Sequence, residues 1–253
     1  MKRLLLLAVL LAMLNGCAWN DRLRAASDLK AMNSGDYFEN PVQSSFVAFI
    51  GKGDVRRADE LLKQGAGVNA VGKDGMTPLF WALSKQNLEG FRYLLAHGAN
   101  PNLIADWHDA NGRAQSETAL RLAAMLEDKR YLEDLLAAGG NPNLMDEVGQ
   151  TPIYVAILHQ RRDTLELLLD KGADIDHVNR SLTTPINYAV SMNHYSLALL
   201  LLSRGADPKI EDRWGYSAID TTKKFGKGGV VRGSDDEAAY TEFVSELKAR
   251  GVW

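Results

Sequence analysis

The sequence predicts an all-α fold, a solenoid of about six helix-pair units joined by finger loops. Two markers carry this prediction, because both recur with the same period, which is the sign of a repeat architecture. Thr-Pro or a related pair recurs at intervals of 41, 33, 33 and 33 residues, and Gly-Ala or a related pair at intervals of 33, 41, 33 and 33 residues. In both series the excess of eight residues falls between Gly98 and Thr118, so one insertion explains both irregularities.

Each marker has a physical role at one end of a helix. Threonine before proline predicts an N-cap followed by the first helical residue, where the N–H that proline lacks is not needed. Glycine after a leucine-rich run predicts a left-handed helix stop. Two adjacent leucines precede each stop, and since one unit cannot bury them alone, neighbouring units are expected to stack. These pairs are Leu61-Leu62, Leu94-Leu95, Leu135-Leu136, Leu168-Leu169 and Leu201-Leu202.

The first residues are typical of an export signal. A positively charged start, MKR, precedes an apolar run of 11 residues at 4–14, which is shorter than the roughly 20 residues that cross a bilayer. The sequence LNGC at residues 14–17 resembles the lipobox of bacterial lipoproteins, in which the cysteine is alkylated with diacylglycerol and the chain is cut before it. The resemblance implies a signal peptide at residues 1–16 and lipidation of Cys17. An ordinary signal peptide with Cys17 as a bystander is the alternative.

The same resemblance indicates a location in the bacterial cell envelope. Ala18 stands where an aspartate would resemble the inner-membrane retention signal of enteric lipoproteins, so we expect a lipid anchor in the outer membrane, facing the periplasm. Loss of residues 1–16 removes two cations and changes the net charge from −3 to −5, which disfavours nucleic acid as a partner. Cys17 is the only cysteine, so the exported chain must fold without an intramolecular disulfide.

The boundaries of the expected segments follow from the markers. Residues 17–42 are interpreted as a lipidated tether or spacer with one possible helix at residues 20–32, able to fold back on the first unit. The repeat domain is expected over residues 43–253. Its units are expected at about residues 43–71, 72–103, 104–144, 145–177, 178–210 and 211–253.

The repeats resemble the ankyrin repeat. The resemblance rests on DGMTPLFWAL, VGQTPIYVAI and TTPINYAV, followed by HGANPN, KGADID and RGADPK. The histidine that usually follows Thr-Pro-Leu and makes a loop hydrogen bond is replaced in all five units that carry Thr-Pro or a related pair. The replacements are Phe80, Arg121, Tyr154, Asn187 and Asp220.

The end units depart from the pattern as the caps of a solenoid should. Ser44-Ser45 stands where Thr-Pro would fall in the first unit. In the last unit we expect Val244 and Leu247 to be buried, whereas Lys248 replaces the second leucine and makes a polar lid.

Signals for catalysis are scarce, so we expect no enzymatic activity, no metal and no cofactor. The histidines, at positions 97, 108, 159, 177 and 194, include no i, i+4 pair and no His-Glu-x-x-His motif. The loop FGKGGVVRGS lacks the Gly-Lys-Ser/Thr ending and the preceding strand of a phosphate-binding loop. A flexible insertion is the favoured interpretation of that loop.

The ankyrin resemblance implies a protein partner, bound by the finger loops and the exposed sides of the first helices. The insertion lengthens one finger, IADWHDANGRAQSE, whose tryptophan and arginine are residue types enriched at binding hot spots. Packing of Trp107 on a neighbouring unit is the alternative. The predicted contact residues are Lys73, Met76, Trp107, His108, Asp109, Arg113, Glu147, Gln150, Tyr154, His159, Arg180, Arg213, Trp214 and Tyr216.

Two functions remain open at this point. Exported ankyrin-like lipoproteins resemble immunity proteins that neutralise a secreted toxic enzyme, such as a phospholipase. The alternative is a periplasmic scaffold or accessory factor that supports a resident enzyme, such as a catalase in peroxide defence. Both need only a binding surface and a membrane tether, so the sequence does not separate them. A neighbouring toxin or lipase gene would favour the first function, and a catalase gene the second.

The lipobox makes the first testable prediction. Cys17→Ser should abolish incorporation of labelled palmitate, because serine cannot replace the thiolate as nucleophile. The variant should accumulate as an uncleaved precursor or as a soluble periplasmic protein, which membrane fractionation would reveal. Unchanged labelling and unchanged fractionation would contradict the lipoprotein interpretation.

Overall fold

The computed structural model describes residues 33–108, 114–226 and 235–253. The predicted signal peptide, Cys17 and the possible helix at residues 20–32 lie outside the described residues, as does most of the glycine-rich loop. The chain divides into two compact parts, an N-terminal part that ends at Asn141 and a C-terminal part, Pro142–Trp253. Within the described ranges, no helix is long and apolar enough to cross a membrane.

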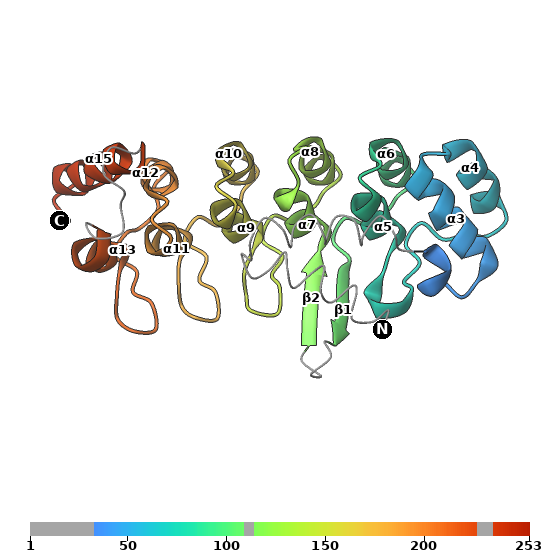
Figure 1. Ribbon diagram of the computed structural model, residues 1–253, viewed down its shortest axis with the longest axis horizontal. Coiled ribbons are helices and arrows are strands. Elements are labelled where there is room, and N and C mark those ends of the chain that lie inside the picture. The colour runs from blue at the N-terminus through green and yellow to red at the C-terminus, as the bar shows by residue number, and fades with distance from the viewer. Residues whose placement is uncertain (1–32, 109–113, 227–234) are drawn as a thin grey trace. The chain divides into compact units, whose positions relative to one another are not determined.

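Helix pairs stack in sequence order in the N-terminal part (Figure 1). The helices are α3 (Pro41–Lys52) and α4 (Val55–Lys63), α5 (Pro78–Lys85) and α6 (Leu88–Ala96), and α7 (Ala119–Met125) and α8 (Arg130–Ala137). Short 3-10 turns occur at η1 (Ser34–Asp36) and η2 (Lys73–Gly75). First helices pack on first helices, α3 on α5 and α5 on α7, and the second helix α6 packs on α8.

The C-terminal part continues the same architecture. Its elements are α9 (Pro152–Leu158), α10 (Arg162–Asp170), α11 (Pro185–Ser191), α12 (Tyr195–Ser203), α13 (Ala218–Thr221), the π-helical turn η3 (Thr222–Gly226) and α15 (Asp235–Ala249). Here α11 packs on both α9 and α13, and α12 packs on α15. The predicted all-α solenoid is therefore confirmed.

Most of these helix starts are capped as predicted: a threonine or serine side chain caps α5, α7, α11 and α13, whereas Thr151 at the start of α9 makes no capping hydrogen bond. Thr77 Oγ1 accepts a hydrogen bond from the backbone N–H of Phe80 at 3.2 Å, with Pro78 as the first helical residue of α5. Ser217 and Asp220 form a reciprocal capping box at the start of α13. The glycine stops are also left-handed, as at Gly172, where φ is 85°.

The stacked leucines form the core. The first leucine of each pair in the four later pairs is fully buried; these are Leu94, Leu135, Leu168 and Leu201, each 0% exposed. Most of the second leucines are half-buried, and Leu202 is the exception. In the first unit α4 buries only Ala58, and both of its leucines are half-buried. The first unit thus covers the stack on one side only, as a cap should.

A ladder of asparagines and aspartates joins neighbouring units beside the glycine stops. Asn69 Nδ2 donates to Gly98 O at 3.0 Å, and Asn69 Oδ1 accepts from the backbone N–H of Asn100 at 2.7 Å. Asn102 makes the same two bonds to the following unit. In the C-terminal part Asn143 bridges in this way to the unit after it. Each bridge satisfies backbone groups that a loop would otherwise leave unpaired.

The described end of the predicted spacer packs on α3 of the first unit and on residues of the second unit. Phe38 is 4% exposed, the Tyr37 ring lies 6.2 Å from the Trp81 ring, and the Lys73 backbone N–H donates to Tyr37 O at 2.8 Å.

Helix α3 starts one turn before Ser44. Its N-cap is Asn40, whose Oδ1 accepts from two backbone N–H groups, and Pro41 follows at the first helical position. Asn-Pro thus does here what Thr-Pro does in later units.

The eight-residue insertion lengthens one finger, as predicted, by extending it as a β-hairpin. Strand β1 (Ile104–His108) pairs antiparallel with β2 (Ala114–Thr118), with Ile104 opposite Thr118 and His108 opposite Ala114. Its backbone ladder supplies the hydrogen bonds that a longer irregular loop would lack.

Helix α15 closes the C-terminal end. Phe243 and Leu247 are 0% exposed, whereas Val244 is only half-buried, so the expectation holds for Leu247 and in part for Val244. The spacing explains this, because i and i+4 share one helix face and Val244 lies beside it. The Phe243 ring meets the Tyr195 ring of α12 at 5.8 Å. Lys248 is exposed, as predicted.

The stacked core makes a prediction about stability. Leu168→Ala should lower the free energy of unfolding by about 2 to 5 kcal/mol, because it leaves a cavity at a fully buried site. Lys248→Ala should change it by less than about 0.5 kcal/mol. Denaturant unfolding followed by circular dichroism checks both, and equal losses would mean that the repeat register is misassigned.

Candidate interaction surface

Each finger of the C-terminal part is a tight turn in which the side chain of the first residue accepts hydrogen bonds from the backbone of the same turn. Asp146 Oδ1 accepts hydrogen bonds from the backbone N–H groups of Val148 at 3.0 Å and Gln150 at 2.7 Å. Asn179 and Asp212 make the same two bonds in the next two fingers. A short side chain that bonds its own backbone two residues later holds such turns in place. The finger conformations are therefore set by local sequence.

Backbone hydrogen bonds also join consecutive fingers. The Arg180 N–H donates to Val148 O at 3.1 Å, and the Arg213 N–H donates to Ser181 O at 3.3 Å. These bonds fix the spacing between the finger tips. The fingers are therefore preorganised, and binding a partner would cost little conformational entropy.

Tyr154 replaces the ankyrin histidine and makes the loop hydrogen bond with a phenol. Its hydroxyl lies 2.6 Å from both His177 O and Thr183 O, to which it donates, at the base of the next finger. Burial raises the pKa of the Tyr154 phenol, which keeps it in its neutral, donating form. Because the side chain is 1% exposed, it is not available as the partner contact that the sequence suggested.

The other replacements act in different ways. Asn187 Nδ2 donates to Tyr216 O at 2.8 Å, which again ties a first helix to the next finger. Arg121 forms a buried ion pair with Glu117, with Nε 2.9 Å from Oε1, at the base of the long hairpin. Phe80 is simply part of the apolar core.

The structure places the other predicted contact residues in several environments. Met76 is 7% exposed and belongs to the core, because it precedes Thr77 at the buried start of α5. The half-buried ones are Glu147, Gln150, His159 and Tyr216. The exposed ones are Lys73, Arg180, Arg213 and Trp214. Trp107 and His108 lie on β1 with side chains outside the described set, and Asp109 and Arg113 lie in the undescribed segment 109–113.

Exposed apolar residues of the fingers are the feature that the sequence analysis missed. Among described residues, seven of the nine exposed large apolar side chains lie on finger segments, two in the N-terminal part and five in the C-terminal part. They are Val71, Ile104, Met145, Val148, Val178, Leu182 and Trp214. The sequence does contain a signal for them, because Val71, Met145 and Val178 each precede a Thr-Pro threonine by six residues.

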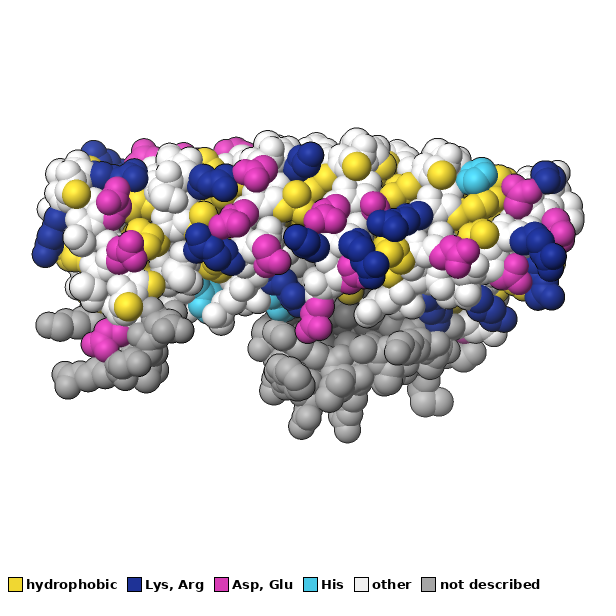
Figure 2. Space-filling model, turned by 90° about the horizontal axis from the view of Figure 1, so that it is seen from above, with side chains coloured by type: hydrophobic (Ala, Val, Ile, Leu, Met, Phe, Trp, Pro, Cys, Tyr) yellow, Lys and Arg dark blue, Asp and Glu magenta, His cyan; other side chains and the backbone are white. Residues whose placement is uncertain are grey.

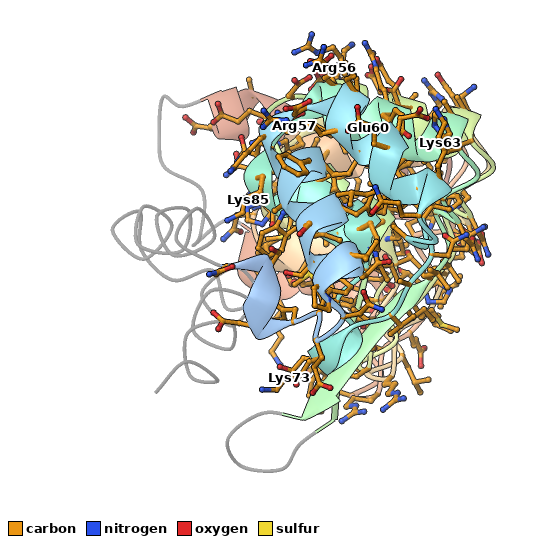
Figure 3. All side chains as sticks on the ribbon, turned by 90° about the vertical axis from the view of Figure 1, so that its right-hand side faces the viewer. Arg56, Arg57, Glu60, Lys63, Lys73 and Lys85 are labelled. Atoms are coloured by element: carbon orange, nitrogen blue, oxygen red, sulfur yellow. The ribbon has the colours of Figure 1, made fainter. Side chains whose placement is uncertain are left out.

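The helical side opposite the fingers has a different character. Figure 2 shows acidic and basic side chains interspersed over the second helices. Several form exposed ion pairs, such as Arg92 with Asp134 and Arg204 with Asp170, each at 2.7 Å. In the N-terminal part, Lys73 lies at the finger end, away from Arg56 and Lys63 on α4 (Figure 3). The helical side is therefore a solvated surface of mixed charge.

A cavity of about 370 Å³ lies beside the last finger of the C-terminal part. Its walls come from the end of α11, the finger turn and α13. The lining residues include Val190, Asn193, Asp212, Trp214, Tyr216 and Thr221. Trp214, at 67% exposure, is the most exposed of the large apolar side chains described.

Stacked helix pairs with tight turns between them define a helical repeat protein of the solenoid class. The chain belongs to the ankyrin-repeat family, because a family model of ankyrin repeats in three copies matches residues 23–105 and 120–212. Ankyrin repeats imply protein partners, so the chain is a protein-interaction module.

Curated relatives share parts of this chain. A mitochondrial disaggregase from Bos taurus is 31% identical over 128 residues, which cover 40% of this chain and 19% of that protein. Protein PhlB from Serratia liquefaciens is 36% identical over 91 residues, which cover 36% of this chain and 37% of that protein. The chain therefore spans well under two thirds of the length of either relative.

Solved structures show the same fold. The ankyrin repeat domain of Bcl-3 superposes with a TM-score of 0.65 at 24% identity, covering 82% of this chain and 86% of that one. The human ASB11 ankyrin repeat domain gives a TM-score of 0.61 at 28% identity, covering 93% and 96%.

The Tyr154 hydrogen bonds make a testable prediction. Tyr154→Phe should lower the free energy of unfolding by about 1 to 3 kcal/mol, because it leaves loop carbonyls without their donor. The raised phenol pKa adds a pH dependence. Its stabilisation is present below the unfolded-state pKa of about 10 and is lost as pH rises above it.

Thermal unfolding between pH 7 and pH 11 measures both effects. The variant should show a smaller alkaline loss than the natural protein. Tyr240→Phe, at a half-buried tyrosine of α15, is the matched control and should change stability by less than about 0.5 kcal/mol. Equal losses in the two variants would contradict the role assigned to the Tyr154 hydroxyl.

Proposed function

We propose that this ankyrin-repeat protein is anchored in the bacterial cell envelope through a lipid on Cys17 and neutralises a secreted toxic enzyme by binding it through the fingers. The concentration of exposed apolar side chains on the fingers is the observation that supports this proposal most. Exposed apolar residues scattered singly are ordinary, whereas five of them on the fingers of the C-terminal part alone favour a binding surface there.

Neutralisation by binding suits this surface. The fingers are held by turn and inter-finger hydrogen bonds, so they can cover an enzyme without a large loss of conformational entropy. The long hairpin β1–β2 extends further than the neighbouring finger of the N-terminal part (Figure 1), so it would meet a partner early. Trp107 and Arg113 stay the predicted anchors of that hairpin.

A lipid anchor supplies the second requirement, which is location. An enzyme that arrives in the periplasm must be intercepted there, and a tether at Cys17 would keep the binding surface at the membrane face. Diacylation or triacylation holds a protein firmly, whereas one acyl chain binds only marginally. Ala18 after the cysteine supports placement in the outer membrane.

Growth protection tests the proposed function. Secreted toxic enzymes of the same bacterium are directed one at a time to the periplasm, with and without the full-length protein, and survival is measured together with affinity. Val71→Asp and Met145→Asp should each weaken binding about tenfold, because a charge is placed at an apolar contact. Ala96→Asp and Ala137→Asp, at exposed positions at the ends of second helices, are matched controls and should leave both readouts unchanged.

Two outcomes would contradict the proposal. Protection that survives both finger substitutions would remove the fingers from the mechanism. Enhanced activity of the bound enzyme would show an accessory role in place of neutralisation.

A further inference from the structure

Two arginines occupy the same position of consecutive fingers in the C-terminal part. Arg180 and Arg213 lie 33 residues apart, and both side chains are exposed. Each reaches over the preceding finger: a Cβ at Gly149 would lie 3.2 Å from Arg180 Cγ, and Arg213 Nη2 donates to Arg180 O at 2.6 Å.

These guanidinium groups have no acidic partner within the described part of the chain. Two like charges held on adjacent turns repel each other. A carboxylate placed near both would gain from each, and charge-assisted bonds from arginine are the strong class of hydrogen bond. The pair therefore favours an acidic ligand group.

A strained leucine lies on the same finger as Arg180. Leu182 has φ of 58°, in the left-handed region, where the equivalent residues of three other fingers are Gly75, Gly149 and Gly215. That conformation is unfavourable for a residue with a Cβ. Its side chain is 52% exposed, so it gains little burial in return. Strain kept at an exposed tip points to use of the side chain by a ligand.

The cavity beside the last finger continues this surface. The Arg213 guanidinium lies 5.8 Å from the centre of the Trp214 ring, and Lys224 Nζ lies 4.5 Å from the centre of the Tyr216 ring. The aromatic walls are therefore rimmed by cations. Asp212 also lines the cavity and carries a negative charge, although its Oδ1 accepts hydrogen bonds from the backbone N–H groups of Trp214 and Tyr216. The cavity therefore suits the apolar side chain of a ligand, and the ligand's carboxylates suit the two arginines.

From these contacts we infer that the last two fingers bind an acidic segment that also carries a bulky apolar side chain. Its carboxylates face Arg180 and Arg213, and its apolar side chain enters the cavity against Trp214, with Leu182 contacting the segment between them. The inference rests on the proposed protein-binding function and specifies the chemistry of the partner. A basic segment would face the like charges of Arg180 and Arg213 and is disfavoured.

Selection of peptides from a random displayed library against the purified full-length protein tests the inference. The expected binders place aspartate or glutamate within a few residues of phenylalanine, leucine or tryptophan. Basic binders, uniformly polar binders or no binders would overturn it. The best selected peptide, labelled with fluorescein, then serves as the probe for affinity by polarisation.

Charge reversal tests the arginines with that probe. The double variant Arg180→Glu/Arg213→Glu should weaken peptide binding at least thirtyfold, and Trp214→Ala about tenfold. The matched control is Lys171→Glu/Lys248→Glu, which makes the same charge change at exposed residues away from the fingers and should alter affinity less than threefold. Equal loss in both double variants would show a nonspecific charge effect and overturn the assignment.

Substitution of Leu182 distinguishes a role in binding from a purely structural role, because the two roles predict different changes in melting temperature and affinity. Leu182→Gly should raise the melting temperature, because glycine removes the strain, while it weakens peptide binding at least fivefold. Leu182→Ala should weaken binding similarly without raising the melting temperature. Unchanged binding in both variants would overturn the role of Leu182. If an enzyme partner is neutralised normally by the arginine double variant, this inference fails while the proposed function stands.

Discussion

Burial of leucine between stacked helix pairs is the constraint on which the rest of this protein depends. A single helix pair has one apolar face and cannot cover it, so each pair is stable only against its neighbours. Leu135 and Leu168, in different parts of the chain, are both completely buried although each sits on a helix of eight or nine residues. Isolated helices of that length are marginal in water, so stacking is what stabilises them.

Stacking alone would leave the connecting loops with unpaired backbone groups. Polar side chains at repeated positions resolve this, and each reaches from one unit to the next. Asn69 bridges to Gly98 and Asn100, while Tyr154 and Asn187 bridge from first helices to the following finger. The ankyrin histidine can be lost because a phenol or an amide at the same position still donates to a loop carbonyl. Phe80 shows that this donor is not required in every unit, because its side chain has none and packs in the apolar core.

Because the core and the loop hydrogen bonds stabilise the fold, the second helices and the fingers can differ in surface chemistry. The second helices carry interspersed charges that hold exposed ion pairs, which contribute little to stability but keep that side solvated. The fingers carry apolar side chains on rigid turns, with Trp214 and Leu182 projecting into solvent. Such a division costs the isolated protein some favourable burial and is consistent with a surface shaped for a partner.

The sequence by itself determined the period, the helix caps, the glycine stops and the position of the insertion, because each depends on residues close together in the chain. The Thr77 cap and the left-handed Gly172 stop are local in this sense.

Only the tertiary structure decided which predicted contacts are accessible. Met76 and Tyr154 resemble surface residues by their position near a finger, yet neighbouring elements bury both. Val71, Met145 and Val178 resemble core residues by their type, yet they are exposed. Burial depends on what the next unit places over a side chain, and that information lies about 33 residues away.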